Sequence, residues 1–272
     1  EVEGNEVEAG TEMLMDLYDK ARNDQRTAIP ASELRIGLKC GGSDGFSGIT
    51  ANPLLGAFSD WLCNEQGGTT VLTEVPEMFG AETLLMQRCI NEQVLDDTKH
   101  LINNFKHYFL SHGQPVGENP SPGNKAGGIS TLEEKALGCT QKSGSSPVYG
   151  VLGYGERLQG HGLHLLSAPG NDLVAATALA AAGCHIVLFT TGRGTPFATA
   201  VPTLKVSTNT SLYQRKGNWI DFNAGSIVED KRIEDLLPDF IHTVLDVASG
   251  KKVKAERNGI HGFAIFKNGV TL

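Results

Sequence analysis

The sequence lacks the apolar runs and basic clusters that would place a chain in a membrane or on nucleic acid. No stretch reaches the roughly 20 consecutive apolar residues that cross a bilayer. The formal net charge is −8, and the nearest basic run is Lys251, Lys252 and Lys254. Because phosphate binding needs concentrated positive charge, we expect no nucleic acid partner and no membrane partner.

Cysteine is also scarce, with five residues scattered over 272. An odd number in a chain long enough to bury a sizeable core argues against disulfide bonds as a framework. We therefore expect a reducing, cytoplasmic compartment. The sequence opens "EVEGNEVEAG", without an initiator methionine, and we expect it to be a piece of a longer protein.

Several catalytic signatures are missing. The sequence has no dinucleotide fingerprint in register, no phosphate-binding loop of the Walker type, no HExxH, no CxxC and no nucleophile elbow. His161 and His164 are three apart in an expected strand, so they face opposite sides and a shared metal is disfavoured. The common nucleotide, zinc-hydrolase and serine-hydrolase classes are therefore excluded.

What the sequence does contain is a strand–loop–helix–strand pattern that occurs twice. Strands are expected within 33–40, 67–76, 162–170, 185–192, 203–209 and 262–270. Helices are expected within 11–26, 53–66, 80–113 (as two helices), 130–138, 171–183 and 233–250. This alternation predicts an α/β fold with an open, mostly parallel sheet and helices on both faces.

The expected domain organisation is simple. Residues 1–272 form one α/β domain of a longer protein, and residues 1–30 form a helical lead-in that Pro30 ends. Residues 112–130 have the Gly, Pro, Asn and Ser content of a loop. Because long loops in compact domains usually carry function or are disordered, we interpret this one as functional.

Three glycine-containing loops follow expected strands, at residues 40–52, 167–172 and 191–197. Ligands of parallel α/β sheets bind beyond the carboxyl ends of the strands. Two of the loops lead directly into a helix, where free backbone N–H groups favour an anion. A single loop would be interpreted as a tight turn, but three in matching positions favour a binding site for a carboxylate or a small phosphate.

These loops carry the candidate chemical groups. Cys40 sits between a strand and a helix, where a thiolate can be stabilised and bind a metal, and Cys139 is a second candidate. Cys63, Cys89 and Cys184 are assigned to packing. Lys125 and Arg193 are suited to clamp a carboxylate. Candidate bases or hard-metal ligands are Asp44, Glu133 and Asp172. For Asn52 and Asn171, capping is the favoured interpretation.

Five long segments together resemble one family. They are "GLKCGGSDGFSGITANPLLG", "NPSPGNKAGGISTLEEKALG", "LLSAPGNDLVAATALAAAGC", "VLFTTGRGTPFATAVPTLKVSTNT" and "WIDFNAG". In this order they are similar to the C-terminal region of the altronate/galactarate dehydratase family, and closer to its altronate branch. The resemblance runs from about residue 34 to the C-terminus.

The resemblance implies a lyase that removes water from a sugar acid, with D-altronate giving 2-dehydro-3-deoxy-D-gluconate as the first expectation. It also implies iron(II), with manganese(II) as an alternative, and N-terminal domains as partners. Galactarate dehydration and a sulfolactate sulfo-lyase-like role stay open. So does a non-catalytic domain that binds a sugar acid or supports an assembly. The sequence does not decide whether the chain forms a homo-oligomer.

The roles expected from the resemblance follow the loops. Cys40 is an iron ligand, with Cys139 or a group outside this chain as a second one. The base or a hard ligand is Asp44, Glu133 or Asp172. Substrate oxygens are expected to contact Gly41, Gly42, Ser43, Asn124, Lys125, Gly170, Asn171 and Arg193.

Overall fold

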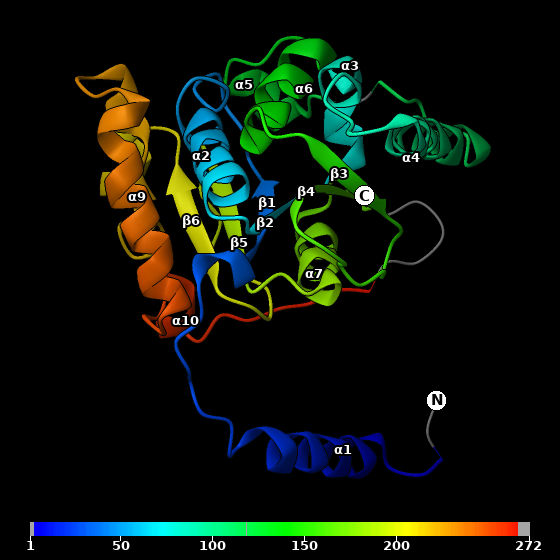
Figure 1. Cartoon of the computed structure of the whole chain (residues 1–272), viewed down its shortest axis with the longest axis vertical. Helices are drawn as coiled ribbons and strands as arrows, with labels where there is room; N and C mark the ends of the chain where they lie inside the picture. The colour runs from blue at the N-terminus through cyan, green and yellow to red at the C-terminus, as the bar shows by residue number, and fades with distance from the viewer. Residues whose placement is uncertain (1–2, 118, 266–272) are drawn as a thin grey trace. The chain divides into compact units, whose positions relative to one another are not determined.

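The computed structural model describes residues 3–117 and 119–265 (Figure 1). It divides into two units, Glu1–Pro30 and Ala31–Leu272, which are described separately. The first unit contains helix α1 (Glu6–Ala21), which begins where the Asn5 side chain accepts hydrogen bonds from the Val7 and Glu8 N–H groups. The helix expected within 11–26 therefore starts and ends five residues earlier, because the asparagine cap decides its first turn.

The second unit is built on a sheet of seven strands within the described residues, all of them parallel. Their spatial order is β3-β4-β2-β1-β5-β6-β7. The strands are β1 (Arg35–Cys40), β2 (Thr69–Leu72), β3 (Val148–Leu152), β4 (Gly162–Leu166), β5 (Ile186–Thr191), β6 (Thr203–Ser207) and β7 (Phe222–Asn223). The predicted parallel α/β sheet is confirmed, whereas strands β3 and β7 were not predicted.

Helices connect these strands. They are α2 (Ala51–Asp60), α3 (Glu82–Met86), α4 (Glu92–Ser111), α5 (Pro122–Ala126), α6 (Leu132–Thr140), α7 (Asp172–Ala182), α8 (Thr210–Arg215), α9 (Ile233–Ala248) and α10 (Lys254–Arg257). The expected pair within 80–113 is confirmed as α3 and α4. Helix α7 begins at the Asn171 cap and ends at Gly183, whose φ of 104° suits glycine.

The sheet buries a different core on each face. Ile36 and Leu38 of β1 belong to a cluster that includes residues of α2, α4 and α9. Leu179 of α7 and Val187 of β5 belong to a second cluster. Because successive strand residues face opposite sides, Val187 lies on the face opposite Ile186 and Leu188. Helices therefore cover both faces, as predicted, with α2 and α9 on one and α7 on the other (Figure 1).

The connectivity reverses at the centre of the sheet. After β1 the chain adds β2, then β3 at the edge and β4 between β2 and β3, all on one side, and it returns to place β5 on the other side of β1. The loops that leave the carboxyl ends of β1 and β5 therefore diverge. This is the position where open α/β sheets bind their ligands.

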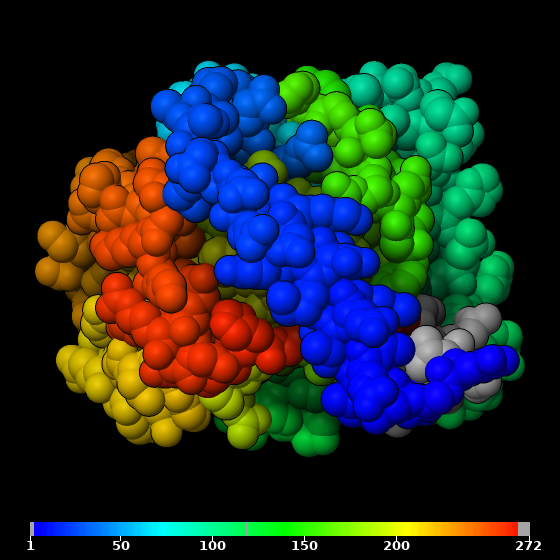
Figure 2. All heavy atoms as spheres, turned by 90° about the horizontal axis from the view of Figure 1, so that it is seen from below, coloured from blue at the N-terminus to red at the C-terminus, as the bar shows by residue number. Residues whose placement is uncertain are grey.

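Two expectations need correction. The strand expected at 262–270 does not form over residues 262–265, which are irregular, and the rest of it lies outside the described residues. Residues 258–265 follow α10 along the surface and are coloured red in Figure 2. That path is held where the Ala264 N–H donates to the Thr177 hydroxyl of α7. Residues 112–130 also contain helix α5, so they are not loop throughout.

No helix among the described residues is both long and apolar enough to cross a membrane.

Candidate functional site

A cavity of about 210 Å³ lies at the point where the loops after β1 and β5 diverge. It draws on segments that are far apart in the sequence. Its lining residues are Cys40, Gly41, Gly42, Glu77, Asn119, Ser121, Gly123, Asn124, Lys135, Gly170, Asp172 and Arg193. All three predicted loops contribute to it, and so does the stretch 112–130. Seven of the sequence-predicted site residues are therefore brought together: Cys40, Gly41, Gly42, Asn124, Gly170, Asp172 and Arg193.

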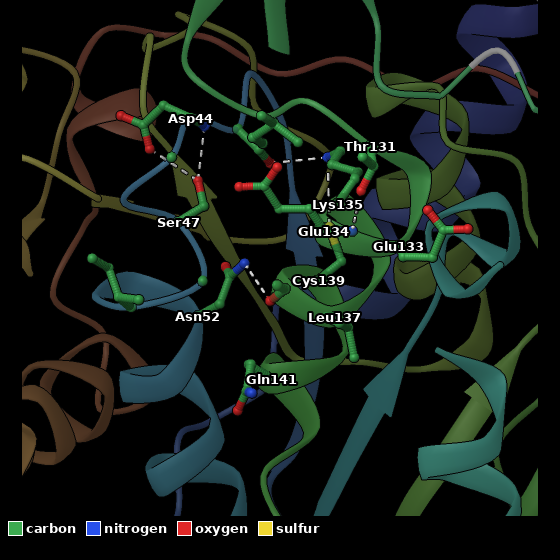
Figure 3. A pocket seen from close by; sticks show the side chains of 16 residues that line it. Asp44, Ser47, Asn52, Thr131, Glu133, Glu134, Lys135, Leu137, Cys139 and Gln141 are labelled. Carbon is green, nitrogen blue, oxygen red and sulfur yellow. Dashed lines mark hydrogen bonds between the residues drawn. The ribbon is translucent and has the colours of Figure 1, made fainter. Parts of the chain in front are cut away.

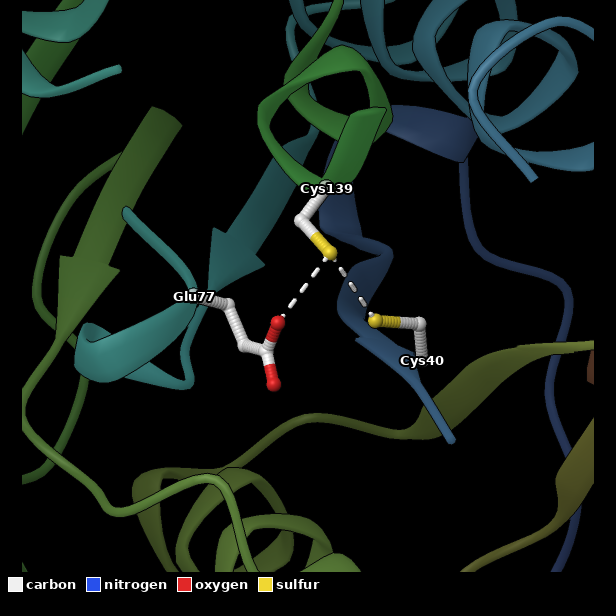
Figure 4. A group of neighbouring side chains, drawn as sticks. All are labelled: Cys40, Glu77 and Cys139. Carbon is white, nitrogen blue, oxygen red and sulfur yellow. Dashed lines mark hydrogen bonds between the residues drawn. The ribbon is translucent and has the colours of Figure 1, made fainter. Parts of the chain in front are cut away.

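Two cysteines form a pair at the base of this cavity. Cys40 ends β1 and Cys139 lies in α6, and their Sγ atoms are 3.4 Å apart (Figure 4). The contact with Cys139 lowers the pKa of Cys40 well below its ordinary value, against the opposing effect of burial and with help from three neighbouring lysines. The same contact, together with burial, raises the pKa of Cys139. The two thiols therefore titrate as a coupled pair, with the pKa of Cys40 lowered and that of Cys139 raised.

A carboxylate completes the cluster. Glu77 follows β2 in a short 3₁₀ turn (Val75–Met78), and its Oε2 accepts from the Cys139 thiol at 3.3 Å. One ligand atom each from Cys40, Glu77 and Cys139 lies within 4.8 Å of the other two. Figure 4 shows the three side chains converging from β1, the turn after β2, and α6. Two sulfurs and one carboxylate oxygen are a donor set that fits iron(II) or zinc, and it is too soft for magnesium.

Lysines surround this cluster. Lys135 Nζ lies 2.9 Å from Glu77 Oε2 and 3.0 Å from Ser43 Oγ. It also contacts both sulfurs, at 3.5 Å for Cys139 and 3.9 Å for Cys40. Burial alone would lower the pKa of Lys135, but the anionic neighbours raise it well above its ordinary value. The ammonium therefore stays charged and offsets the negative charge of the cluster.

A second buried group of charges lies beside the first. The Glu74 carboxylate accepts from Lys39 Nζ at 2.6 Å and from Lys142 Nζ at 3.2 Å. Burial, then the Cys40 thiolate, raises the pKa of Glu74 to about 7, although both lysines oppose that shift. Lys39 also reaches Asp172 Oδ1 at 2.8 Å. This group therefore connects the thiolate to the Asp172 carboxylate at the cavity wall.

The glycines in this region make room for side chains. A Cβ atom on Gly41 would lie 2.6 Å from Asp172 Oδ1, so only glycine allows that carboxylate to approach. The Gly41 N–H already donates to the Thr190 carbonyl, so this glycine offers the cavity space and not a hydrogen bond. Gly42 has a φ of 63°, and a Cβ atom there would lie 3.3 Å from Arg193 Cβ.

A larger cavity of about 450 Å³ lies between the loop after β1 and helix α6 (Figure 3). Ser43, Asp44 and Glu133 line it, and Lys135 lines both cavities. Asp44 is committed to holding loops together, because it accepts from the Thr208 hydroxyl at 2.9 Å and from Asn209 Nδ2 at 3.1 Å. Glu133 is exposed. Neither residue lines the smaller cavity as the structure describes it.

The remaining candidates fall into structural positions. Asn171 caps α7 by accepting from the Leu173 and Val174 N–H groups, as the capping interpretation predicted. Asn124 Nδ2 donates to the Ser43 carbonyl at 2.9 Å, which fixes α5 against the loop after β1. Lys125 is exposed, and it is not among the described residues that line either cavity.

Sequence reasoning missed five charged residues of the site. They are Lys39, Glu74, Glu77, Lys135 and Lys142. A signal existed for Glu74 and Glu77, because "TEVPE" lies at the carboxyl end of the strand expected within 67–76 and thus belongs to the ligand edge. Lys39 also stood out as a charge within the apolar strand "RIGLKC". Nothing in the local pattern marked Lys135 or Lys142 as buried.

Comparisons with known proteins agree with the five resembling segments. Residues 31–271 match the family described as D-galactarate/altronate dehydratase, C-terminal. The chain is 66% identical to an altronate dehydratase of Bacillus subtilis, over 98% of this chain and 54% of that protein. It is 59% identical to an altronate dehydratase of Escherichia coli over 98% of this chain and 54% of that protein.

A galactarate dehydratase (L-threo-forming) of Escherichia coli is more distant, at 42% identity over 91% of this chain and 48% of that protein. The chain thus spans about half the length of these curated relatives. The family match covers most of the chain, and the matched region includes every residue of the cavity and its thiol pair. The chain belongs to the D-galactarate/altronate dehydratase family and corresponds to its C-terminal region.

Proposed function

We propose that this chain carries the catalytic groups of a sugar-acid dehydratase, with D-altronate as substrate and 2-dehydro-3-deoxy-D-gluconate as product. The observation that carries the proposal is the cluster of Cys40, Cys139 and Glu77 beside a polar cavity in a chain of this family. The higher identity to two altronate dehydratases than to a galactarate dehydratase supports the choice of substrate.

Dehydration removes a proton from C2 and hydroxide from C3, and the resulting enol becomes the 2-keto acid. The C2 proton is acidic only when negative charge on the neighbouring carboxylate is stabilised. Arg193 lines the cavity and suits the substrate carboxylate, since a guanidinium binds carboxylates through two parallel hydrogen bonds. Asp172 lines the same cavity and is our choice for the base, because Asp44 is engaged elsewhere and Glu133 is exposed.

Lys135 lines the cavity beside the thiol pair, and we assign its positive charge to stabilising the negative charge that develops as the C3 hydroxyl departs. Cys40, Cys139 and Glu77 would hold iron(II), and their two sulfurs make iron a better match than magnesium. When bound, such an ion supplies positive charge for the carboxylate and the enediolate. The five free thiols support a reducing, cytoplasmic location.

A second candidate is a domain that binds the sugar acid and is not active on its own. The observation that favours it is the length of the relatives, of which the chain spans about half. In that case the site would be completed by the domains that the longer relatives carry.

The test is an anaerobic assay with iron(II) and D-altronate that measures the 2-keto-3-deoxy product. The chain is compared with the same chain fused to the remaining half of the Bacillus subtilis relative, and Cys40→Ser is the control in both. Product from the chain alone supports a complete site in residues 1–272. Product only from the fusion supports the second candidate. If neither protein converts altronate, galactarate or sulfolactate, the proposal fails.

A further inference from the structure

We propose that Lys39 and Glu74 are a positioning pair that holds the Asp172 carboxylate at the wall of the small cavity, oriented to take a proton from the substrate. Asp172 Oδ2 is the atom that we assign to the proton, because Oδ1 is bound to Lys39. The inference rests on the proposed function and identifies two residues that serve the reaction without contacting the substrate.

Lys39 is placed for this role by the strand that carries it. Its side chain is fully buried, and it lies one residue before Cys40, which ends β1. Its Nζ contacts three oxygens: Glu74 Oε1 at 2.6 Å, Asp172 Oδ1 at 2.8 Å and the Cys40 carbonyl at 2.7 Å. An ammonium has three N–H donors, so Lys39 has none left for a substrate.

Glu74 fixes the other side of Lys39. Its side chain is also fully buried, and its Oε2 accepts from the Cys40 N–H at 2.9 Å. Its φ of 68° is left-handed, and it is the one non-glycine residue with a positive φ among the described residues. Such a backbone costs free energy and persists only where the surroundings impose it, often at functional sites. The two carboxylate oxygens therefore tie Lys39 to the backbone of the thiolate residue.

Asp172 is held from two sides. It is the first residue of α7, and 40% of its side chain is exposed although its partner Lys39 is buried. The bare backbone of Gly41 lies against the carboxylate, since a Cβ atom there would be 2.6 Å from Oδ1 and 2.7 Å from Oδ2. Lys39 and Gly41 thus restrict the carboxylate while it still lines the cavity.

The competing explanation is that Lys39 only neutralises buried charge and stabilises the fold. A double-mutant cycle separates the two, because residues that act through one another show non-additive losses. The four proteins are wild type, Lys39→Met, Asp172→Asn and the double variant, prepared in whichever form of the protein converts D-altronate with iron(II). Thermal unfolding of each protein reports folding separately from turnover.

We expect Lys39→Met and Asp172→Asn each to lower kcat by about 100-fold or more, within the range for loss of a general base, and to change KM by less than about threefold. The kcat of the double variant should lie within about threefold of the kcat of Asp172→Asn. Lys142→Met is the matched control, because it removes a buried lysine that contacts Glu74 and, within the described part of the chain, forms no hydrogen bond or ion pair with Asp172. Its loss of kcat should be the same in the wild-type and Asp172→Asn backgrounds.

If Lys39→Met does not fold, Glu74→Gln replaces Lys39→Met in the cycle. Glutamine keeps the shape of the glutamate side chain but weakens its interaction with Lys39. We expect a loss of about tenfold in kcat that disappears in the Asp172→Asn background. Losses that multiply in the double variants would overturn the positioning role while leaving the proposed function intact. A wild-type protein that makes no product from altronate, galactarate or sulfolactate would overturn both the positioning role and the proposed function.

Discussion

Cys40 Sγ and Cys139 Sγ lie 3.4 Å apart at the end of β1 and in α6, 99 residues from each other in the sequence. Their mutual contact moves the two thiol pKa values in opposite directions, downward for Cys40 and upward for Cys139. With Glu77 they form one cluster of potential metal ligands. This relationship leads to the first prediction.

Removal of either cysteine should abolish metal binding at this site. Cobalt(II) added to the anaerobic protein should produce thiolate charge-transfer absorption, and Cys40→Ser and Cys139→Ser should each lose most of it, because serine is a poor ligand for this class of ion. Cys63→Ser is the control, since Cys63 is half-buried and contacts the Thr70 hydroxyl instead. An unchanged absorption spectrum in Cys40→Ser would contradict the assignment.

Arg193 and Lys125 should behave differently, although the sequence marked both as carboxylate clamps. Both residues are exposed, but Arg193 lines the small cavity and Lys125 is not among the described residues that line it. Arg193→Ala should raise KM for the sugar acid by about 10- to 100-fold, since a charged hydrogen bond contributes roughly 1.5–3 kcal/mol. Lys125→Ala should leave KM within about twofold. Steady-state kinetics on both variants measures these KM values. Equal increases in KM would contradict the different roles assigned to Arg193 and Lys125.

Asp44 should prove structural. Asp44→Ala leaves the buried Thr208 hydroxyl without its acceptor and removes one of the acceptors of Asn209 Nδ2, which keeps its bond to the Gly192 carbonyl. We expect a loss of about 1–3 kcal/mol in the free energy of unfolding, measured with urea. Asp239→Ala, at an exposed position of helix α9, is the control and should change stability by less than about 0.5 kcal/mol. A variant of full stability that has lost turnover would return Asp44 to the catalytic candidates.

The burial of Lys205 leads us to expect that the free energy of unfolding depends on pH. It is buried in β6, and burial lowers its pKa to about 8 although Asp221 opposes the shift. Below pH 8 the folded state must hold a buried ammonium. Between pH 8 and about 10.5 the unfolded chain binds the extra proton, so stability from this group rises with pH.

Lys205→Met should therefore stabilise the protein at pH 7 by on the order of 1–3 kcal/mol, and this gain should fade as the pH approaches 10. Urea unfolding at pH 7, 8.5 and 10 measures it. The same change at exposed Lys252 should have no such pH dependence. A gain that stays constant with pH would mean that Lys205 does not titrate in this range.

The pattern of the sequence was sufficient for much of the fold. The buried strand around Leu38 and the capped helix at Asn171 were recognisable, because alternation and capping depend on neighbours in the chain. The short strand β7 (Phe222–Asn223) was not, because two residues give no period and form a strand only by pairing with β6. The expected final strand does not form over 262–265, the part of it that the structure describes.

Some residues of the candidate site could likewise be predicted from the sequence, and others could not. Cys40, Gly41 and Arg193 could be found from the sequence, because loops after parallel strands meet at one edge of the sheet and glycines mark close approach. Lys135 and Lys142 could not, because their burial depends on which segments pack over α6 and the turn after it. Lys125 and Lys135 are both lysines in polar stretches of sequence, yet one is exposed and the other contacts the thiol pair.

The sequence by itself therefore determined the parallel α/β fold, the edge of the sheet that carries the ligand loops, and the family. Only the tertiary structure decided which charged side chains meet there: that Cys139 joins Cys40, that Glu74 lies between Lys39 and Lys142, and that Asp44 is engaged by Thr208. The physical reason is range. Caps, turns and alternation act between residues a few positions apart, whereas the partners of these groups lie 35 to 164 positions away and are brought together only by folding.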